Sequence, residues 1–552
     1  MRPIGRLISA LLGAGWMAFV VALPLLGVWL ASSLIALAGG PRWLALAGGV
    51  LLFPVLPLWW ERRADRAWKA KQARTKRMTP AKRHLTTLDR LVLRTLSLNL
   101  VFLAALLVGF PRVAFTALAT CGDWFLGEST SPAANDARKV LSAAATGLEW
   151  LHEWANPNPY RTAGDETPIG DAVTPTKQQA PTGSAWSRWR ALTDAEKLAR
   201  ADGGDPTSRR HEGDGDDPSS KLQEGDGDDP GSTLHEGDGD QDIELHVGDD
   251  SPKKPPPPTD AVWKVGETAW PWPDSVHPVV AGMTADQEQS IESVARTIAA
   301  RTSDPFDRVK ALHDWVVTRL TYDQASTQPG QRKPQDAQSV FLARTGVCEG
   351  YARLLVALGK VTGDRIVYVT GEVREPNGEL APVGHAWNAV ELKGAWYLVD
   401  ATWDDPVVDG ESDTYRTDYL FIPPSLAAMD HLPDDTRFQL LEKPLSRVDF
   451  LRQAPGRPAL AREGLALVEP QRGVVDVRGA LTVRLENPRR VHVMLTVGAG
   501  DGPVKECGVS DAATVELTCP LPGAGRYVAR LYTNKQRFGT FGSAADFQVN
   551  AR

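Results

Sequence analysis

Long apolar runs near the start of the chain limit its possible folds more than any other feature of the sequence. Residues 7–37 and 43–60 are almost wholly apolar and are separated by a Gly-Gly-Pro break, and a third run covers residues 96–119. A helix needs roughly 20 apolar residues to cross a bilayer. A cleaved signal peptide is the alternative for the first run, but that run is longer than a signal core and a second span follows it. We therefore expect residues 1–120 to form three transmembrane helices.

The loop after the second run indicates how these helices cross the membrane. Residues 61–94 hold twelve Lys and Arg against three acidic residues, and loops of this kind stay in the cytoplasm. The third run then leads outward, with Arg112 able to extend its charge toward the far interface. We therefore expect an inner-membrane protein whose chain beyond Cys121 is periplasmic, starting with a short helical segment at 121–155. If the third run only lay on the membrane, the rest of the chain would be cytoplasmic.

Residues 156–260 have the composition of a disordered linker. They are rich in Pro, Gly and Asp and lack aliphatic runs, so they cannot bury enough apolar surface to fold. A twelve-residue repeat, HEGDGDDPSSKL, begins at residue 211 and recurs twice in modified form. We interpret this segment as a self-repelling acidic tether. Calcium binding by the clustered carboxylates is the alternative, although the spacing of an EF-hand loop is missing.

Charge and cysteine content exclude several classes of protein. Residues 201–250 hold 17 acidic and 3 basic residues, so the net charge of -7 is segregated and the rest of the chain carries +7. The parts expected to fold lack a basic face with base-stacking aromatics, so nucleic acid is not an expected partner.

Four cysteines are too few for a disulfide scaffold, and they lack the paired spacing of a zinc ribbon. Any thiol chemistry must therefore rest on one residue.

Cys348 is the cysteine whose surroundings favour chemistry. Apolar residues recur at helical spacing over residues 284–302 and 305–320, and Asp304 before a proline is a good N-cap. A Thr-Gly break then precedes an amphipathic segment that opens at about Cys348. A thiol in the first turn of a helix faces the positive end of the helix dipole, which favours the nucleophilic thiolate. The alternative is a small buried apolar residue, the ordinary role of a free cysteine.

A predicted hairpin over residues 384–403 supplies a base and its orienting carboxylate. GHAWNAVEL and AWYLVDATW are two strand-like runs around a Lys-Gly turn. A turn centred on that dipeptide places His385 opposite Thr402, with Asp400 on the same face and displaced by two residues. Diagonal neighbours are about 7–8 Å apart at the backbone, within reach of a histidine–carboxylate hydrogen bond. Such an Asp fixes the imidazole tautomer, while the other ring nitrogen takes the thiol proton.

Two alternatives remain open for these residues. His385 can be a structural histidine with its hydrogen bonds satisfied. A metal site built from Cys, His and Asp is the other alternative, but it lacks a fourth ligand and a Cys-x-x-Cys knuckle. No cofactor is therefore expected, apart from the calcium alternative for the acidic repeats.

Four sequence blocks between about residues 304 and 441 resemble the transglutaminase-like superfamily of papain-fold cysteine enzymes, and they occur in that family's order. The blocks are WVVTRLTYD (315–323), GVCEGYA (346–352), GHAWNAV (384–390) and WYLVDATWDDP (396–406). The resemblance implies an α+β papain-like core over residues 261–454 and a catalytic triad of Cys348, His385 and Asp400. Residues 419–441 further resemble the tail of the kyphoscoliosis-peptidase-like branch, here of a membrane-anchored bacterial type, in which a β-sandwich often follows.

The remaining features of the predicted site are less constrained. The backbone N–H of Cys348 is one natural oxyanion donor, and a polar side chain near Tyr322 is a candidate for the second. We expect Trp387 and Trp403 to pack around the catalytic hairpin rather than to contact substrate. The loop at residues 375–382 is expected to help set substrate choice.

Residues 455–552 are predicted to form an all-β domain. About seven short alternating strands separated by turn residues suggest an immunoglobulin-like sandwich. Cys507 and Cys519 lie twelve residues apart and can form a disulfide outside the cytoplasm, if their backbones approach closely enough. Such a domain either binds a partner or braces the catalytic domain.

These observations lead to one principal functional hypothesis and one alternative. The first is a membrane-anchored, extracytoplasmic cysteine enzyme that attacks protein or peptide amides of the cell envelope through a thioester, as a peptidase, deamidase or crosslinking enzyme. The alternative is a non-catalytic binding or scaffolding protein of the cell envelope with a transglutaminase-like module. An intact triad argues against the alternative.

Overall fold

The computed structural model describes most of the chain outside the expected linker. It covers residues 2–74, 84–127, 131–161, 264–327, 330–374, 380–381, 383–405, 407–408, 411–412, 415–454, 456–499 and 503–552. The acidic repeats, with their calcium alternative, lie outside the described residues, as does most of the loop at 375–382.

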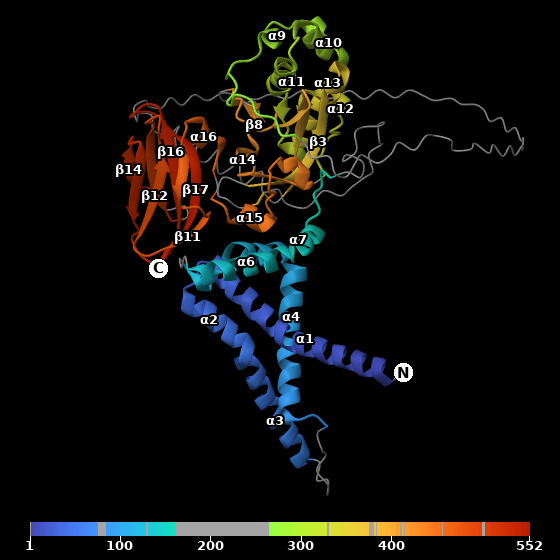
Figure 1. Cartoon of the computed structure of the whole chain (residues 1–552), viewed down its shortest axis with the longest axis vertical. Helices are drawn as coiled ribbons and strands as arrows, with labels where there is room; N and C mark the ends of the chain where they lie inside the picture. The colour runs from blue at the N-terminus through green and yellow to red at the C-terminus, as the bar shows by residue number, and fades with distance from the viewer. Residues whose placement is uncertain are drawn as a thin grey trace, which may run out of the picture. The chain divides into compact units, whose positions relative to one another are not determined.

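Within the described part of the chain, three N-terminal helices have the length and composition to cross a membrane (Figure 1), as expected. α1 spans Arg2–Leu37, and α4 spans Thr87–Gly109. Between them, α2 (Arg42–Val50) leads into α3 (Leu56–Arg74) through η1 (Leu51–Val55), where the backbone of Phe53 is extended and the helix is kinked. Their candidate spanning segments are Ala14–Leu37, Trp43–Arg74 and Thr87–Gly109.

The third helix occupies different residues from those expected. A capping box between Thr86 and Asp89 starts α4 well before the apolar run, because the two side chains satisfy backbone N–H groups of the first turn. The chain then breaks before Pro111, which opens a separate helix, α5 (Pro111–Cys121). Proline suits the first turn of a helix but not its interior. The single apolar run at 96–119 is therefore divided between two helices.

Arg112 makes contacts that the sequence did not predict. It lies in the first turn of α5, and its guanidinium donates hydrogen bonds to the carbonyl of Leu380 at 2.7 Å and to the carbonyl of Ala381. The expected helical segment follows as a 3₁₀ turn, η2 (Trp124–Leu126), and the helices α6 (Pro132–Thr146) and α7 (Glu149–Ala155).

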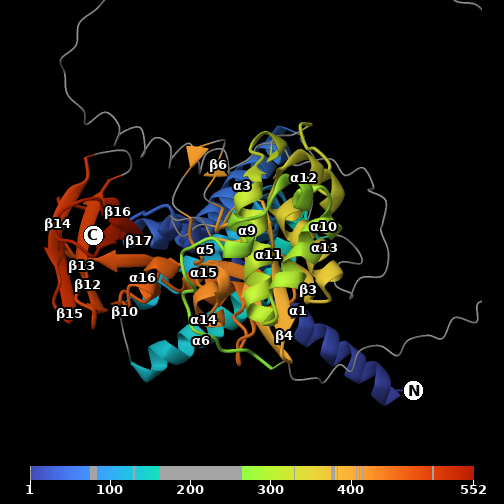
Figure 2. The ribbon, with the colours of Figure 1, turned by 90° about the horizontal axis from the view of Figure 1, so that it is seen from above.

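A five-stranded antiparallel sheet with the order β8-β5-β4-β3-β9 forms the centre of the expected catalytic part. Helix α13 packs on β3 and β4, and α10, α11 and α12 pack on α13 (Figure 2). The strands are β3 (Arg365–Val373), β4 (His385–Leu392), β5 (Ala395–Val399), β8 (Leu420–Ile422) and β9 (His431–Pro433). The longer helices are α10 (Ile291–Arg301), α11 (Pro305–Arg319), α12 (Ala337–Ala343) and α13 (Cys348–Thr362).

Shorter elements complete this part of the chain. A second sheet has the order β2-β1-β6-β7, with β1 (Thr321–Tyr322), β2 (Thr345–Gly346), β6 (Val407–Val408) and β7 (Glu411–Ser412). The short helices are α9 (Pro278–Ala281), α14 (Pro424–Ala427), α15 (Arg447–Arg452) and α16 (Pro458–Arg462), with 3₁₀ turns η3 (Ala285–Glu288), η4 (Ala325–Thr327) and η5 (Thr436–Gln439).

Local signals in the sequence explain the elements that position the site. Asp304 caps α11, and its carboxylate accepts hydrogen bonds from two backbone N–H groups of the first turn. Lys393 and Gly394 form the turn between β4 and β5 with φ of 51° and 76°, the left-handed values of a two-residue hairpin turn. Asn388 therefore pairs with Val399, which is the register that the sequence predicts.

The C-terminal residues form two sheets packed around a shared apolar core, as an immunoglobulin-like sandwich requires. One sheet has the order β10-β12-β15 and the other β11-β17-β16-β13-β14, so the described residues of this region form eight strands rather than about seven. The strands are β10 (Ala466–Glu469), β11 (Val474–Val477), β12 (Ala480–Glu486), β13 (His492–Gly498), β14 (Lys505–Ser510), β15 (Thr514–Pro520), β16 (Gly525–Asn534) and β17 (Gly542–Ala551).

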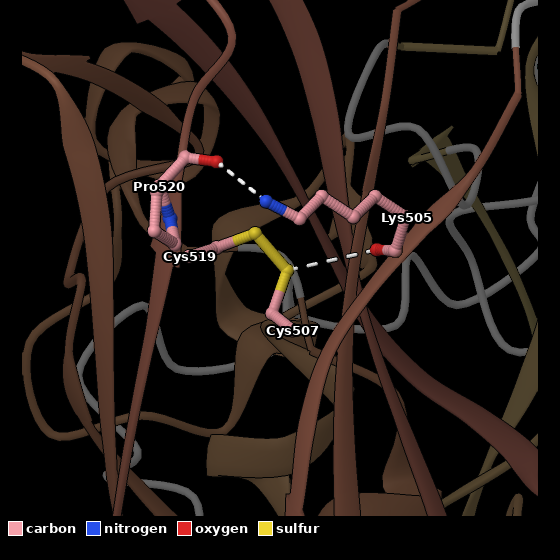
Figure 3. The surroundings of a disulfide bond; sticks show 4 residues. All are labelled: Lys505, Cys507, Cys519 and Pro520. Carbon is pink, nitrogen blue, oxygen red and sulfur yellow. Dashed lines mark hydrogen bonds between the residues drawn. A yellow bond between two sulfur atoms is a disulfide. The ribbon is translucent and has the colours of Figure 1, made fainter.

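A disulfide joins the two sheets of the sandwich. Cys507 in β14 and Cys519 in β15 are bonded, with their Cα atoms 5.0 Å apart (Figure 3). The ammonium of Lys505 lies 3.4 Å from the carbonyl oxygen of Pro520 beside the bridge. The bridge thus ties together the edge strands of two different sheets.

Candidate active site

Cys348 is the first residue of α13 and is almost fully buried, with 1% of its surface exposed. Val347 is the N-cap and has an extended backbone. Its N–H donates to Oε1 of Gln335 at 2.8 Å, which fixes the direction in which the chain enters the helix. The thiol therefore stands where helix N–H groups have no partner within the helix. This is the position that the sequence predicts.

Gly350, in the first turn of α13, allows this close packing. A Cβ at Gly350 would lie 2.7 Å from Oε1 of Gln335 and 2.7 Å from Cγ2 of Val340. Real Cβ atoms essentially never come so close to other atoms. Gln335 and Val340 therefore pack so closely against the helix that position 350 has room only for glycine.

The β4–β5 hairpin brings His385 and Asp400 together. His385 begins β4 and has no exposed surface, and Asp400 follows β5 with 2% exposed. Nε2 of His385 lies 2.6 Å from Oδ2 of Asp400. The other carboxylate oxygen accepts hydrogen bonds from the backbone N–H groups of Thr402 at 2.9 Å and Trp403 at 3.3 Å. The carboxylate is thus held on both sides, and it fixes the orientation of the imidazole.

The charges of the site favour an imidazolium next to the thiol. Burial works against the charged imidazole, but the charges of Asp400 and of the Cys348 thiolate, with their hydrogen bonds, raise the pKa of His385 to about 10. Burial likewise opposes the charge of Asp400, yet the two neighbouring histidines hold the pKa of that carboxyl far below its ordinary value. Asp400 is bonded to Nε2 of His385, so Nδ1 is the ring nitrogen that can exchange a proton with Cys348.

A second buried histidine, His431, contacts Asp400. Its Nε2 lies 3.1 Å from Oδ2 of Asp400 and its Nδ1 lies 2.7 Å from Oδ1 of Asp430. Tyr419 donates its hydroxyl to Oδ2 of Asp430 at 2.6 Å. Sequence reasoning missed His431 because β9 joins the sheet next to β3, through a pairing that no turn or spacing reveals.

The aromatic side chains of the hairpin pack around these histidines. The ring of Trp387 stacks on His385 with 5.9 Å between centroids, and Trp403 lies 5.5 Å from His385 and 4.4 Å from His431. Both tryptophans therefore pack against the histidines of the hairpin and of β9. Their packing agrees with the role that the sequence predicts.

Tyr160 also lies at the site, although it belongs to the segment 156–260 that was expected to be a disordered linker; residues 156–161 of that segment are described and Tyr160 is packed in a core. It is buried, with 3% exposed, in the same core as Cys348. Burial and the negative charges of Cys348 and Tyr322 raise the pKa of its hydroxyl well above the ordinary value. The side-chain amide of Asn158 donates to the carbonyl of Gly371 at 3.0 Å and to Asp434 at 3.1 Å. A single aromatic residue in a polar segment gave no signal of this contact.

The sequence predicts two oxyanion donors, the N–H of Cys348 and a polar side chain near Tyr322. The N–H of Cys348 lies at the start of α13, as expected. Tyr322, the neighbourhood suggested for a second donor, is buried in β1, with its ring centroid 6.3 Å from that of Tyr351.

One group of side chains in the described part of the chain has atoms close enough to hold a metal ion. His385, Asp400 and His431 each offer a ligand atom, and these atoms lie within 4.8 Å of one another. Two ligands of one tetrahedral zinc ion stand about 3.3 Å apart, whereas His385 and Asp400 are separated by 2.6 Å. That distance is a direct hydrogen bond, so the residues fit proton exchange better than metal binding.

Comparison with known proteins supports the resemblance seen in the sequence. A family model described as the transglutaminase-like superfamily matches residues 292–401. The kyphoscoliosis peptidase of Mus musculus is 29% identical over 195 residues, 33% of this chain and 29% of the relative. That of Homo sapiens is 26% identical over 213 residues, 36% of this chain and 32% of the relative. The matches therefore span less than a third of each relative's own length.

Two solved structures are also similar to part of the chain. One, named a TGase, has 19% sequence identity, covers 22% of this chain and 34% of its own, and has a TM-score of 0.18. The other, provisionally named a cysteine protease from Cytophaga hutchinsonii, has 23% identity, covers 25% of this chain and 49% of its own, and has a TM-score of 0.18. On the family match, residues 292–401 form a transglutaminase-like domain, and this part of the chain belongs to the transglutaminase-like superfamily.

Proposed function

We propose that the chain is a membrane-anchored, extracytoplasmic cysteine enzyme that acts on protein or peptide amides of the cell envelope. The observation that carries the proposal is the buried hydrogen bond between His385 and Asp400, together with the interaction of His385 with the Cys348 thiol at the first position of α13. A thiolate, an imidazolium and an orienting carboxylate are the parts that thiol acyl transfer requires.

The proposed reaction proceeds through a thioester. Sγ of Cys348 attacks the amide carbonyl carbon, and N–H groups at the start of α13 stabilise the negative charge that develops on oxygen. The carbon–nitrogen bond then breaks, and His385 gives its proton to the leaving amine or ammonia. Water or another amine next loses a proton to His385 and attacks the thioester, which releases the acyl group and restores the thiolate. Hydrolysis, deamidation and crosslinking differ only in the leaving group and the acceptor.

Two features support a location outside the cytoplasm. Three apolar helices and the basic stretch at 61–94, which covers the end of α3 and the start of α4, satisfy the positive-inside rule with the catalytic part on the far side. The disulfide between Cys507 and Cys519 suits an oxidising compartment. The three helices serve as the anchor in this proposal.

The proposal is tested by the peptides that the enzyme processes. Cell-envelope peptides from cells with the wild-type chain are compared with those from cells with Cys348→Ala and, as a matched control, Cys121→Ala at the other free cysteine. We expect the Cys348 variant alone to lose a set of cleaved, deamidated or crosslinked peptides. Identical peptide sets in all three, combined with a defect only when the whole domain is deleted, would instead indicate scaffolding.

A further inference from the structure

We infer that His431 is a positioning residue of this site, which holds Asp400 in place and shares the charge of that carboxylate with His385. The inference rests on the function proposed above, because it assigns His431 a part in the same chemistry. It concerns a residue outside the predicted triad of Cys348, His385 and Asp400.

The contacts of His431 connect the triad to a second carboxylate. The same oxygen, Oδ2 of Asp400, receives His385 at 2.6 Å and His431 at 3.1 Å. On its other side His431 meets Asp430 at 2.7 Å, and Asp430 in turn accepts the hydroxyl of Tyr419 at 2.6 Å. His431 has 5% of its surface exposed. The chain of contacts is therefore removed from water.

These contacts determine the charge of His431. An ionised carboxylate can only accept hydrogen bonds, so both ring nitrogens of His431 must donate and the ring must be an imidazolium. The charged and titratable groups that surround it are Asp400, Asp430, His385 and Tyr419, with the buried Arg374 guanidinium acting on Asp430. Burial opposes the charge, but Asp430 and Asp400 raise the pKa of His431 above its ordinary value.

The shared oxygen gives His431 a specific effect on the reaction. If Asp400 bound His385 alone, the full negative charge of the carboxylate would act on the His385 imidazolium. It would then hold more strongly the proton that His385 must give to the leaving amine. A second positive ring on the same oxygen weakens that hold and also favours the negative thiolate nearby. Removing the positive charge of His431 should therefore move every other titration in the cluster to higher pH.

The experiment measures the alkylation rate of Cys348 by iodoacetamide from pH 4 to 10.5 in the full chain in detergent, with peptide mass spectrometry separating Cys348 from Cys121. The variants are His431→Gln, His385→Ala and His152→Gln. His152 is a matched control because it is also a buried histidine bonded to a carboxylate, at 3.0 Å from Glu372, but outside the triad contacts. Plotted against pH, the alkylation rate gives a profile with two limbs. The acid limb reports formation of the thiolate–imidazolium pair, and the alkaline limb reports loss of the His385 proton.

We expect both limbs of the His431→Gln profile to move to higher pH by about one unit. The His152→Gln profile should match that of the wild type. A purely structural role would lower rates or thermal stability without moving both limbs together. A His431→Gln profile that superimposes on the wild type, while His385→Ala differs from both, would overturn this inference and leave the proposed function standing. A wild-type profile equal to that of His385→Ala would overturn the proposed function itself.

A second variant keeps the test decisive if His431→Gln fails to fold. Asp430→Asn has the same shape as the wild-type side chain but lacks the charge that holds the proton on His431. We expect a smaller upward shift of both limbs in this variant, since a negative charge is lost together with the positive one. An unchanged or downward-shifted profile in folded Asp430→Asn would contradict the inference.

Discussion

Asp400 carries a negative charge in a place that water does not reach, and its neighbours offset the cost of that burial. Two imidazole rings share Oδ2, and two backbone N–H groups bind Oδ1. A buried ion pair of this kind adds little stability over an apolar replacement, but removing one partner leaves an uncompensated charge. The arrangement therefore fixes the geometry of the carboxylate more than it adds to stability.

The raised pKa of His385 predicts how stability depends on pH. The folded pKa is about 10, whereas the unfolded value is about 6.5. The stabilising contribution is therefore complete below about pH 6.5 and is lost as the pH rises through about 10, at up to about 1.4 kcal/mol per pH unit. His385→Gln should show a shallower fall in the free energy of unfolding between pH 7 and 10. Denaturant unfolding at several pH values measures this, and parallel curves for the two proteins would contradict it.

At the scale of elements, the start of α13 depends on glycine at position 350. Gly350→Ala should destabilise the fold by about 1–3 kcal/mol, because the new Cβ would collide with Gln335 and Val340. Gly523→Ala serves as the control, since a Cβ there meets nothing within 4 Å. Denaturant unfolding compares the two variants with the wild type. An equal effect of both substitutions would show that the approach of Gln335 to α13 is not tight.

Residues 156–161, at the start of the expected linker, should limit access to the thiol. Tyr160 is buried in the core that contains Cys348, whereas Trp154 on the preceding helix is exposed. Tyr160→Ala should therefore raise the alkylation rate of Cys348 several-fold at neutral pH, and Trp154→Ala should leave it unchanged. The measurement is again the modification of the Cys348 peptide over time. A rate that falls or stays constant in Tyr160→Ala would show that this ring does not cover the site.

Local signals in the sequence predicted some of these elements and missed others. The β4–β5 register followed from one Lys-Gly turn, and the α13 start followed from a break before Cys348, because both depend on neighbours along the chain. His431 and Tyr160 reach the site through pairings across long stretches of sequence, which periodicity does not encode. The division of the third apolar run at Pro111 was missed for another reason, since apolar composition alone does not separate one helix from two.

At the scale of the whole molecule, the expected topology places the catalytic part on the outside of the membrane. Alkaline phosphatase fused after Asp260 should be active, because that enzyme needs an oxidising compartment for its disulfides. A cytoplasmic reporter fused at the same point should be inactive. The same pair fused after Arg74 provides the matched control, with the opposite result expected for the basic loop. An inactive phosphatase together with an active cytoplasmic reporter after Asp260 would contradict the proposed location.

The central claim is that His385, oriented by Asp400, activates Cys348, and one measurement tests it most directly. The alkylation rate of Cys348 at pH 6 is compared in the full-length wild type, His385→Ala and Asp400→Asn, with Cys121 in the same chain as a reference thiol. The account predicts at least a tenfold lower rate in both variants, with no change at Cys121. Equal rates at Cys348 in all three proteins would contradict the claim that this thiol is an activated nucleophile.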